Sequence, residues 1–488
     1  MHACPQSASE PLLQQFVAWI STGPVIAELR TGLIGDNARV SGPFGEKPLV
    51  YADYVASGRA LMQVEQFILE RVLPYYANSH TEASYCGGFM TRLRREARAA
   101  IASCCNAGSE HAVIFAGSGA TAGINRLVSL LGVNAEIAAG ERARIIVGPY
   151  EHHSNLLPWR ESGAEVVEVG ESAQGGPDLE RLEALLAETD APRLTICSFS
   201  AASNVTGIVS NIVDVTRLAK AAGAKMVWDY AGAGPYLPID MTPAPDCAID
   251  AIVVSPHKFV GGPGSSGVLI VRRDAVTTCK PTWPGGGTVS FVSTSGHDYS
   301  TSLEAREEAG TPNVIGDIRA ALAFLVKDAI GADDAASRNE WLASHAMTRL
   351  CAMSGIEVLG SLTASRLPIF SIRMKDGRGG YVHQQLVTRM LSDRFGIQAR
   401  GGCACAGPYA HRLLDIGAEQ SAVMRAAILA GEELEKPGFI RFNLSVLMTD
   451  DKVDYILRSI EELAKDAPTL ASCCDVDPAR AIFAPRAA

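Results

Sequence analysis

Lys258 follows a short apolar run, and this position suggests a chemical role for its amine. Residues 251–254 read Ala-Ile-Val-Val, and three residues separate them from the lysine. A lysine amine that its surroundings partly relieve of its proton can form a Schiff base. Position alone does not decide this, because a lysine after a strand is more often a surface cation and residues 261–264 can be a simple turn.

Two further positions could serve a cofactor bound by such a lysine. Asp229 ends the apolar run of residues 225–228, where a carboxylate could hold a pyridine nitrogen protonated and make the ring an electron sink. Residues 117–121 read Gly-Ser-Gly-Ala-Thr before a predicted helix, so free backbone N–H groups and the Thr121 hydroxyl suit a phosphate. Plainer interpretations exist, since an aspartate often caps a turn and glycine-rich turns are common.

His152 and His153 follow another predicted strand. An imidazole there could stack on an aromatic ring or move protons near neutral pH. Adjacent residues of an extended loop point to opposite sides, and no cysteine or carboxylate cluster with zinc spacing accompanies the pair. We therefore expect no metal site.

These side chains need a scaffold that brings them together, and the sequence predicts one. Apolar runs alternate with predicted helices, as is typical of strands joined by crossover helices into a mainly parallel sheet. Ligands of such sheets bind beyond the carboxyl ends of the strands, so the loops after Phe115, Trp228 and Val254 should line one site. The runs lie at residues 112–115, 144–147, 194–199, 225–228 and 251–254, and the helices at 120–131, 179–188 and 213–222.

The length of 488 residues favours a large and a smaller domain, because it exceeds what one compact core usually fills. Beyond residue 315 the pattern changes to a long helix through Lys327, followed by strands near 369–373 and 440–443 and helices near 382–395 and 451–464. The last residues are rich in Ala, Pro and Cys and are expected to form a loose tail. The predicted divisions are an N-terminal segment 1–50, a large domain 51–315, a small domain 316–466 and a tail 467–488.

Composition and charge argue against several other classes of protein. With 47% hydrophobic and 20% charged residues, extensive disorder is not expected. A net charge of -10 is unfavourable for a nucleic-acid binder. The sequence has no apolar stretch of about 18 residues, which argues against a membrane span. Because there is also no signal-peptide pattern, we expect the twelve cysteines to be reduced thiols. We expect a cytoplasmic protein that binds neither nucleic acid nor a membrane.

Taken in order along the chain, the motifs resemble those of class V aminotransferase-fold enzymes, most of all group II cysteine desulfurases and selenocysteine lyases. The resemblance extends from about residue 51 to residue 463. Several motifs in one order are more specific than any single one. They are Gly-Ala-Thr at 119–121, Glu-His-His-Ser-Asn at 151–155, Ser-Asn-Val-Thr-Gly at 203–207, Asp229, Ser-Pro-His-Lys at 255–258, Gly-Gly-Gly-Thr at 285–288 and Glu-Ala-Gly-Thr-Pro-Asn at 308–313.

The resemblance implies a fold-type I enzyme of the α/β class that binds pyridoxal 5'-phosphate (PLP) and acts on a small amino acid. The large domain would contain a mainly parallel seven-stranded sheet, and the smaller C-terminal domain would be α+β. Lys258 would carry the cofactor, His152 would stack on its ring and assist proton transfers, and Asp229 would pair with the ring nitrogen. The other cofactor-binding residues would be Ala120 and Asn204, the latter also near the substrate, and, at the phosphate, Thr121, Ser255 and His257.

The family is usually a homodimer, and the resemblance therefore implies one here. Thr288 would reach the phosphate site of the partner subunit.

Residues 400–408 bear on the reaction. By the resemblance, Arg400 would clamp the substrate α-carboxylate, a task that suits the two-pronged guanidinium. Aligned on the arginine and on Pro408, Cys405 falls where desulfurases carry the cysteine that takes sulfur as a persulfide. Cys403 has no counterpart there, whereas Arg-x-Gly-Cys-x-Cys is similar to the desulfurase domain of molybdenum cofactor sulfurases. Alternatively, both cysteines are small residues of a tight loop.

Two departures from the family leave the reaction open. Gly232 occupies the position of a glutamine that, in desulfurases, hydrogen-bonds the phenolate oxygen of the cofactor. The segment 409–437 is longer than the family needs and directly follows the two cysteines.

Three hypotheses follow. The first is a cysteine desulfurase or selenocysteine lyase that produces alanine and a Cys405 persulfide or selenide, with a sulfur-acceptor protein as a candidate partner. The second is another PLP reaction without a catalytic thiol, such as transamination, C–S β-elimination or epimerisation. The third, a non-catalytic PLP-binding protein, gives no reason to keep Lys258, Asp229, His152 and Arg400 together.

Overall fold

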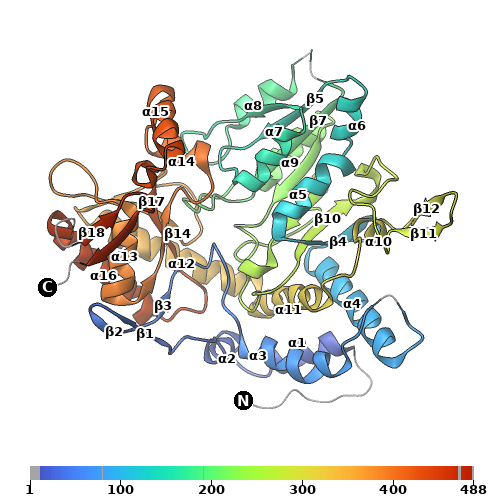
Figure 1. Cartoon of the computed structure of the whole chain (residues 1–488), viewed down its shortest axis with the longest axis horizontal. Helices are drawn as coiled ribbons and strands as arrows, with labels where there is room; N and C mark the ends of the chain where they lie inside the picture. Colours follow the sequence, from blue (N-terminus) through green and yellow to red (C-terminus); the bar gives the residue numbers. More distant parts are fainter. Residues whose placement is uncertain (1–10, 80, 189, 191, 471–473, 486–488) are drawn as a thin grey trace.

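The computed structural model describes residues 11–79, 81–188, 190, 192–470 and 474–485, and its central element is a seven-stranded sheet (Figure 1). The strand order is β4-β10-β9-β8-β7-β5-β6. The neighbours from β9 to β6 pair in parallel, and β10 runs antiparallel between β4 and β9. The strands are β4 (His111–Gly117), β5 (Ala143–Val147), β6 (Glu165–Glu168), β7 (Leu194–Ser200), β8 (Lys225–Asp229), β9 (Ala251–Val254) and β10 (Gly267–Arg272).

The central strands are largely apolar, as expected for a sheet whose two faces are both covered by helices. Ile252 and Val254 of β9 pack into the core that contains α11 (Val314–Ile330), and Ala251 and Val253 pack into the core that contains α5 (Gly119–Leu130). Successive side chains of a strand point to opposite faces, so a sheet buried on both sides needs continuous apolar runs. The predicted mainly parallel sheet and its α/β class are confirmed.

A second, smaller domain contains the four-stranded antiparallel sheet β13-β14-β17-β16. Its core includes Phe370, Leu386, Ile440 and Leu457. The domain lies beside the carboxyl ends of the large parallel sheet (Figure 1). Its elements are α12 (Ala332–Cys351), β13 (Ile356–Val358), β14 (Ile369–Met374), α13 (Gln384–Phe395), β16 (Arg400–Gly402), β17 (Phe439–Asn443) and α16 (Asp450–Leu470).

The remaining elements are peripheral to the two sheets. Among the described residues, no helix combines the length and apolarity needed to cross a bilayer. Around the large domain lie α1 (Leu12–Ile20), α2 (Val25–Thr31), α3 (Met62–Phe67), α4 (Tyr85–Cys104), α6 (Val133–Ala138), α7 (Leu157–Glu161), α8 (Leu179–Leu186), α9 (Ile212–Ala221), α10 (Leu303–Glu307) and the projecting hairpin of β11 (Val289–Val292) and β12 (His297–Tyr299). Near the small domain lie β1 (Arg39–Gly42), β2 (Gly45–Pro48), β3 (Val50–Tyr51), β15 (Ile397–Gln398), α14 (Gly407–Leu413) and α15 (Ala418–Leu429).

The structure differs from the sequence-based divisions at two places. Helix α11, which we assigned to the small domain, packs on α4 within the core of the large domain. The segment from residue 467, expected to be loose, first extends α16 to Leu470 and then forms an antiparallel hairpin of β18 (Cys474–Asp477) and β19 (Ile482–Pro485). Its few apolar side chains find a surface on the small domain, because Cys474 joins that core and the ring centroid of Phe483 lies 5.2 Å from that of His383.

Candidate active site

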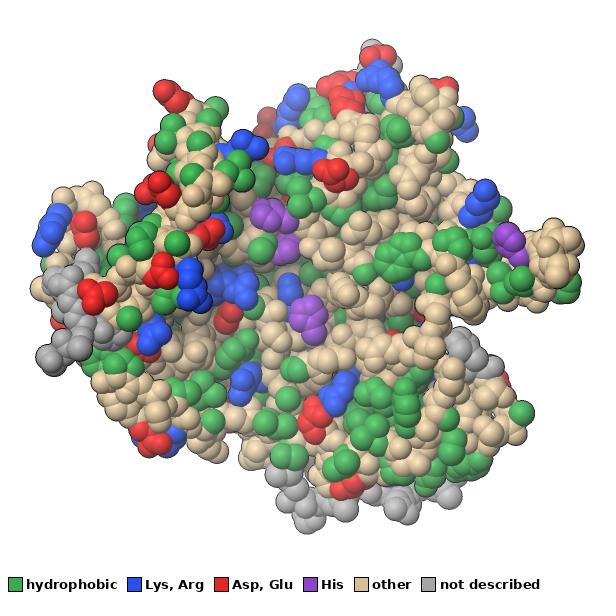
Figure 2. All heavy atoms as spheres, viewed as in Figure 1, with side chains coloured by type: hydrophobic (Ala, Val, Ile, Leu, Met, Phe, Trp, Pro, Cys, Tyr) green, Lys and Arg blue, Asp and Glu red, His purple; other side chains and the backbone are tan. Residues whose placement is uncertain are grey.

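A cavity of about 230 Å³ opens at the carboxyl ends of the parallel strands, where the small domain meets the large one. Figure 2 shows histidine and basic side chains near the middle of this face, between the two domains. The cavity brings together most of the predicted site residues. Those that line it are Ala120, Thr121, His152, Asn204, Asp229, Ser255, His257, Lys258 and Arg400.

One end of the cavity is formed by the turn that starts α5. Gly117 and Gly119 adopt φ values of +85° and +62°, which favour glycine. A Cβ on Gly119 would lie only 3.0 Å from the Ser255 hydroxyl, so the backbone must approach closely here. The Ala120 N–H donates to Ser255 Oγ at 2.9 Å, and Thr121 Oγ1 lies 2.7 Å from Ser154 Oγ. Backbone N–H groups and hydroxyls at a helix start form a donor set that fits a phosphate.

Lys258 and Asp229 face the middle of the cavity from neighbouring strand ends. Burial lowers the pKa of Lys258 to about 8, against the opposing effect of the Asp229 charge. An appreciable fraction of this amine is therefore neutral and nucleophilic near neutral pH. Asp229 is buried, and its Oδ1 accepts the Ala231 N–H at 2.7 Å. Burial raises the pKa of Asp229, and the positive charge of Lys258 opposes that rise.

His152 presents a neutral ring to the same cavity. Burial, followed by the charge of Lys258, lowers the pKa of His152 to about 3. Its Nδ1 accepts the Ser154 N–H at 3.1 Å, so the proton of the neutral ring is on Nε2. A neutral imidazole in a fixed orientation can stack on a heteroaromatic ring.

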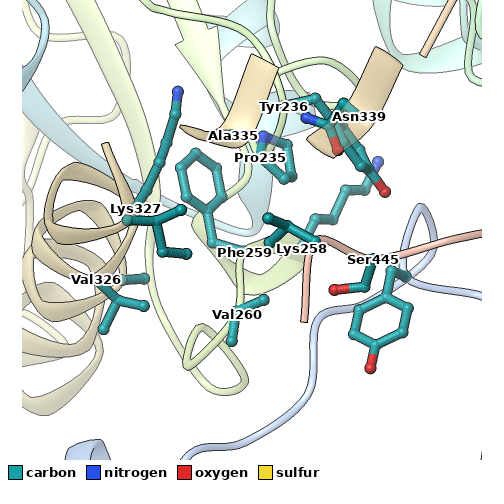
Figure 3. A pocket seen from close by; sticks show the side chains of 14 residues that line it. Pro235, Tyr236, Lys258, Phe259, Val260, Val326, Lys327, Ala335, Asn339 and Ser445 are labelled. Carbon is teal, nitrogen blue, oxygen red and sulfur yellow. The ribbon is translucent and has the colours of Figure 1, made fainter. Parts of the chain in front are cut away.

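A second lysine with a low pKa lies close by but lines a different cavity. Burial lowers the pKa of Lys327, on α11, to about 8, and its Nζ donates to the Leu237 carbonyl. Figure 3 shows a pocket lined by both lysines, in which their side chains extend in different directions. That pocket has a volume of only about 30 Å³. A depressed pKa alone therefore does not single out Lys258. Its position beside Asp229 in the large cavity does.

Arg441 also lines the large cavity, and the sequence analysis missed it. It lies on β17 directly opposite Arg400 of β16. Asp53 joins the two, since its Oδ1 accepts from Arg441 Nη2 at 2.7 Å and its Oδ2 accepts from Arg400 Nε at 3.2 Å. Arg441 is buried, and its Nε has no partner among the described residues, whereas the Arg400 side chain is 46% exposed. A charged residue inside the apolar run 439–443 was the available signal.

Cys403 and Cys405 belong to a tight turn beside the cavity, and we call residues 403–407 the thiol loop. Ala404 and Cys405 have φ values of +52° and +55°, and the Ala406 N–H donates to the Cys403 carbonyl at 3.2 Å. Asn204 Nδ2 donates to the Ala404 carbonyl at 2.8 Å. Ala404 thus lines the cavity, and Cys405, although not among its described lining residues, is exposed directly beside it.

Two predicted features remain as predictions. Thr288 is buried away from the cavity described here, and its Oγ1 donates to the Gly285 carbonyl at 2.6 Å. Its contact with a partner subunit stays a prediction. Gly232 lies against Asn204, whose buried Oδ1 has no partner in the described part of the chain. A buried amide oxygen next to Gly232 therefore lacks a hydrogen bond from the described residues.

Comparison with known proteins places this geometry in a family. The sequence model of a family described as Aminotransferase class-V matches residues 50–456. The chain belongs to this family. A cysteine desulfurase from Enterobacter sp. (strain 638) is 32% identical to this class-V chain over 367 residues, which are 74% of the chain and 85% of that relative. A cysteine desulfurase from Klebsiella pneumoniae is 28% identical over 88% of the chain and 96% of its own length. The structure of a cysteine desulfurase from Thermococcus onnurineus covers 90% of the chain and 98% of that protein with a TM-score of 0.72 at 22% identity, which shows a shared fold.

The two low-pKa lysines allow a matched test of which one this class-V enzyme uses. Wild-type protein supplied with PLP should absorb as a lysine-bound cofactor, and borohydride should bleach that band and fix PLP to the peptide that contains Lys258. Lys258→Ala should lose the fixation, because the amine beside Asp229 is gone. Lys327→Met should retain it, because Lys327 lines the other pocket. Mass spectrometry of the reduced peptides distinguishes the two, and full fixation in Lys258→Ala would contradict the assignment.

Proposed function

We propose that this chain is a PLP-dependent cysteine desulfurase that converts cysteine to alanine and holds the abstracted sulfur as a persulfide on Cys405. The observation that carries the proposal is a hydrogen bond between a residue that lines the cavity and the thiol loop. Asn204, which lines the cavity with Lys258 and Asp229, donates directly to Ala404 of the thiol loop. The desulfurase names of the relatives that align over most of the chain support the same reading.

The residues around the cavity fit PLP. The start of α5 and the hydroxyls of Thr121 and Ser255, with His257, suit its phosphate, and Asp229 suits its ring nitrogen. Bound there, PLP would supply an electron sink for breaking bonds at the substrate α-carbon. The chain itself supplies a partly neutral Lys258 amine that can carry the cofactor and exchange protons, and a neutral His152 ring.

The substrate would be a small amino acid held by its α-carboxylate between Arg400 and Arg441. Both guanidinium groups already contact one carboxylate, that of Asp53, and the unpaired Arg441 Nε offers a further donor. The substrate side chain would then extend toward the cavity mouth, where the thiol loop lies. A thiolate at Cys405 would attack the sulfur, form the S–S bond of the persulfide and leave the electrons of the broken C–S bond with the carbon skeleton.

Several further features belong to the proposal. Nine of the described cysteines, all except Cys474, are free thiols, which suits a reducing cytoplasm. The exposed Phe291 and Val292 of the β11–β12 hairpin suit burial in a homodimer, in which Thr288 would contact the phosphate site of the other subunit. A sulfur-acceptor protein would be the partner that receives the persulfide sulfur. Selenocysteine is a second candidate substrate, because selenide leaves more readily than sulfide.

Removing Arg400 tests how the substrate is held. Arg400→Ala should raise the apparent KM for cysteine about tenfold to 150-fold, because a charge-assisted hydrogen bond contributes about 1.5–3 kcal/mol, and it should leave bound PLP intact. Arg441→Gln provides the comparison through the same steady-state assay of alanine. Unchanged kinetics in Arg400→Ala together with a raised KM in Arg441→Gln would transfer the role to Arg441.

The thiol pair tests the reaction itself. Cys405→Ala should abolish alanine formation from cysteine and leave the absorption of bound PLP unchanged, because only the sulfur acceptor is lost. Cys403→Ala is the matched control two residues away and should retain persulfide formation on Cys405. Mass spectrometry after exposure to cysteine should find the added sulfur on the peptide that contains both residues. A fully active Cys405→Ala variant without any sulfur adduct in the wild type would leave a thiol-independent PLP reaction instead.

A further inference from the structure

His153 contacts the thiol loop twice, although neither its sequence position nor the proposed chemistry gives it a role. Its backbone N–H donates to the Cys405 carbonyl at 2.8 Å. Its ring Nε2 accepts the Gly407 N–H at 3.0 Å. One residue thereby holds both the turn that contains Cys405 and the start of α14 directly after it.

The thiol loop needs such support because its backbone is unfavourable on its own. Ala404 and Cys405 are consecutive non-glycine residues in the left-handed region, with φ values of +52° and +55°. Side chains with a Cβ rarely adopt this conformation, and it persists only where surrounding contacts hold it. Among the described residues outside the loop, those that hydrogen-bond Ala404 and Cys405 are Asn204 and the His153 backbone. Ala406 and Gly407 are bonded by Ala410 and His411 of α14 and by the His153 ring.

The approach between His153 and the loop depends on a glycine. A Cβ on Gly407 would lie 3.1 Å from His153 Nε2, which is closer than ordinary contact. Gly407 therefore lets its backbone N–H reach the ring. The ring accepts this N–H only while Nε2 carries no proton, and burial together with the charge of Arg160 lowers the pKa of His153 in support of that state.

The side chains of the adjacent residues His152 and His153 contact different parts of the site. The His152 ring lines the cavity, whereas the His153 ring, 6.1 Å away between centroids, contacts the thiol loop. The dipeptide 152–153 thus connects the turn that contains Cys405 to the wall of the cavity.

We propose that His153 is a positioning residue that holds the thiol loop so that Cys405 faces the substrate in the cavity. The kinetic part of this inference rests on the proposed desulfurase function. Its structural part, the hold on the loop, is measured separately.

The test uses the PLP-loaded full chain and three variants. His153→Leu removes the ring acceptor, and His153→Gln offers a side-chain oxygen in its place. His345→Leu is the control, since His345 bonds Asp454 in the small domain, away from the cavity. The measurements are the kcat and KM of alanine formation, the absorption of bound PLP, and hydrogen exchange at the Gly407 amide.

His153→Leu should lower kcat about threefold to tenfold, as expected for one lost hydrogen bond, and should change KM for cysteine by less than about twofold. The Gly407 amide should exchange at least about threefold faster, while the PLP absorption stays unchanged. His153→Gln should recover most of the kcat, and His345→Leu should match the wild type.

Wild-type kcat or unchanged Gly407 exchange in His153→Leu would overturn the inference, as would a His153→Gln variant as impaired as His153→Leu. Loss of the PLP absorption in His153→Leu would also overturn it, because the residue would then support the cavity rather than the loop. A wild-type protein that forms no alanine would instead refute the desulfurase proposal, and the exchange measurement would then decide the hold on the loop by itself.

Discussion

The site depends on one constraint, which is that the large sheet is buried on both faces. Strands such as β8 and β9 have no solvent-facing side for a polar residue, so polar groups can appear only where the strands end. The carboxyl ends of parallel strands lie along one edge, and Asp229 and Lys258 therefore meet there although 28 positions separate them in the chain. The burial that stabilises the fold also lowers the pKa of Lys258 and so prepares its amine for chemistry.

A buried carboxyl group also links two of the segments that form the cavity. Glu151 is buried, its Oε1 accepts the Ser200 N–H at 2.9 Å, and its Oε2 accepts the Ser200 hydroxyl at 2.8 Å. Burial, with a further contribution from the Asp229 charge, raises the pKa of Glu151 to about 8. Buried polar groups with satisfied hydrogen bonds hold a specific geometry, because any displacement would leave one of them unpaired. Glu151 therefore anchors the end of β7 to the segment that carries both His152 and His153.

The sequence predicted the parts of this arrangement that are local. Asp229 and Lys258 follow apolar runs whose burial was readable from the sequence pattern. Five strands (β4, β5, β7, β8 and β9) and three helices (α5, α8 and α9) of the large domain appear where the pattern indicated, whereas β6, β10 and α4 were not predicted. Arg441 escaped because its importance comes from the antiparallel register that sets it opposite Arg400, which no local pattern reveals. The turn at Ala404 and Cys405 escaped for a related reason. Positive φ values are usually signalled by glycine, whereas here contacts from distant residues impose them.

The local charge of the cavity explains how an acidic chain can favour anionic ligands. The whole chain has a formal net charge of -10, yet the cavity is lined by Lys258, Arg400 and Arg441. Among the described residues, Asp229 is the one carboxylate that lines it, and Asp53 hydrogen-bonds both arginines. Two guanidinium groups that share one carboxylate retain positive charge, and the buried Arg441 has lost much of its hydration. A substrate carboxylate can pair with these guanidinium groups and remove little further water from the protein, because Arg441 was already desolvated when the chain folded. This local positive charge supports the proposed binding of a phosphate and an α-carboxylate, while the overall negative charge disfavours larger polyanions such as nucleic acids.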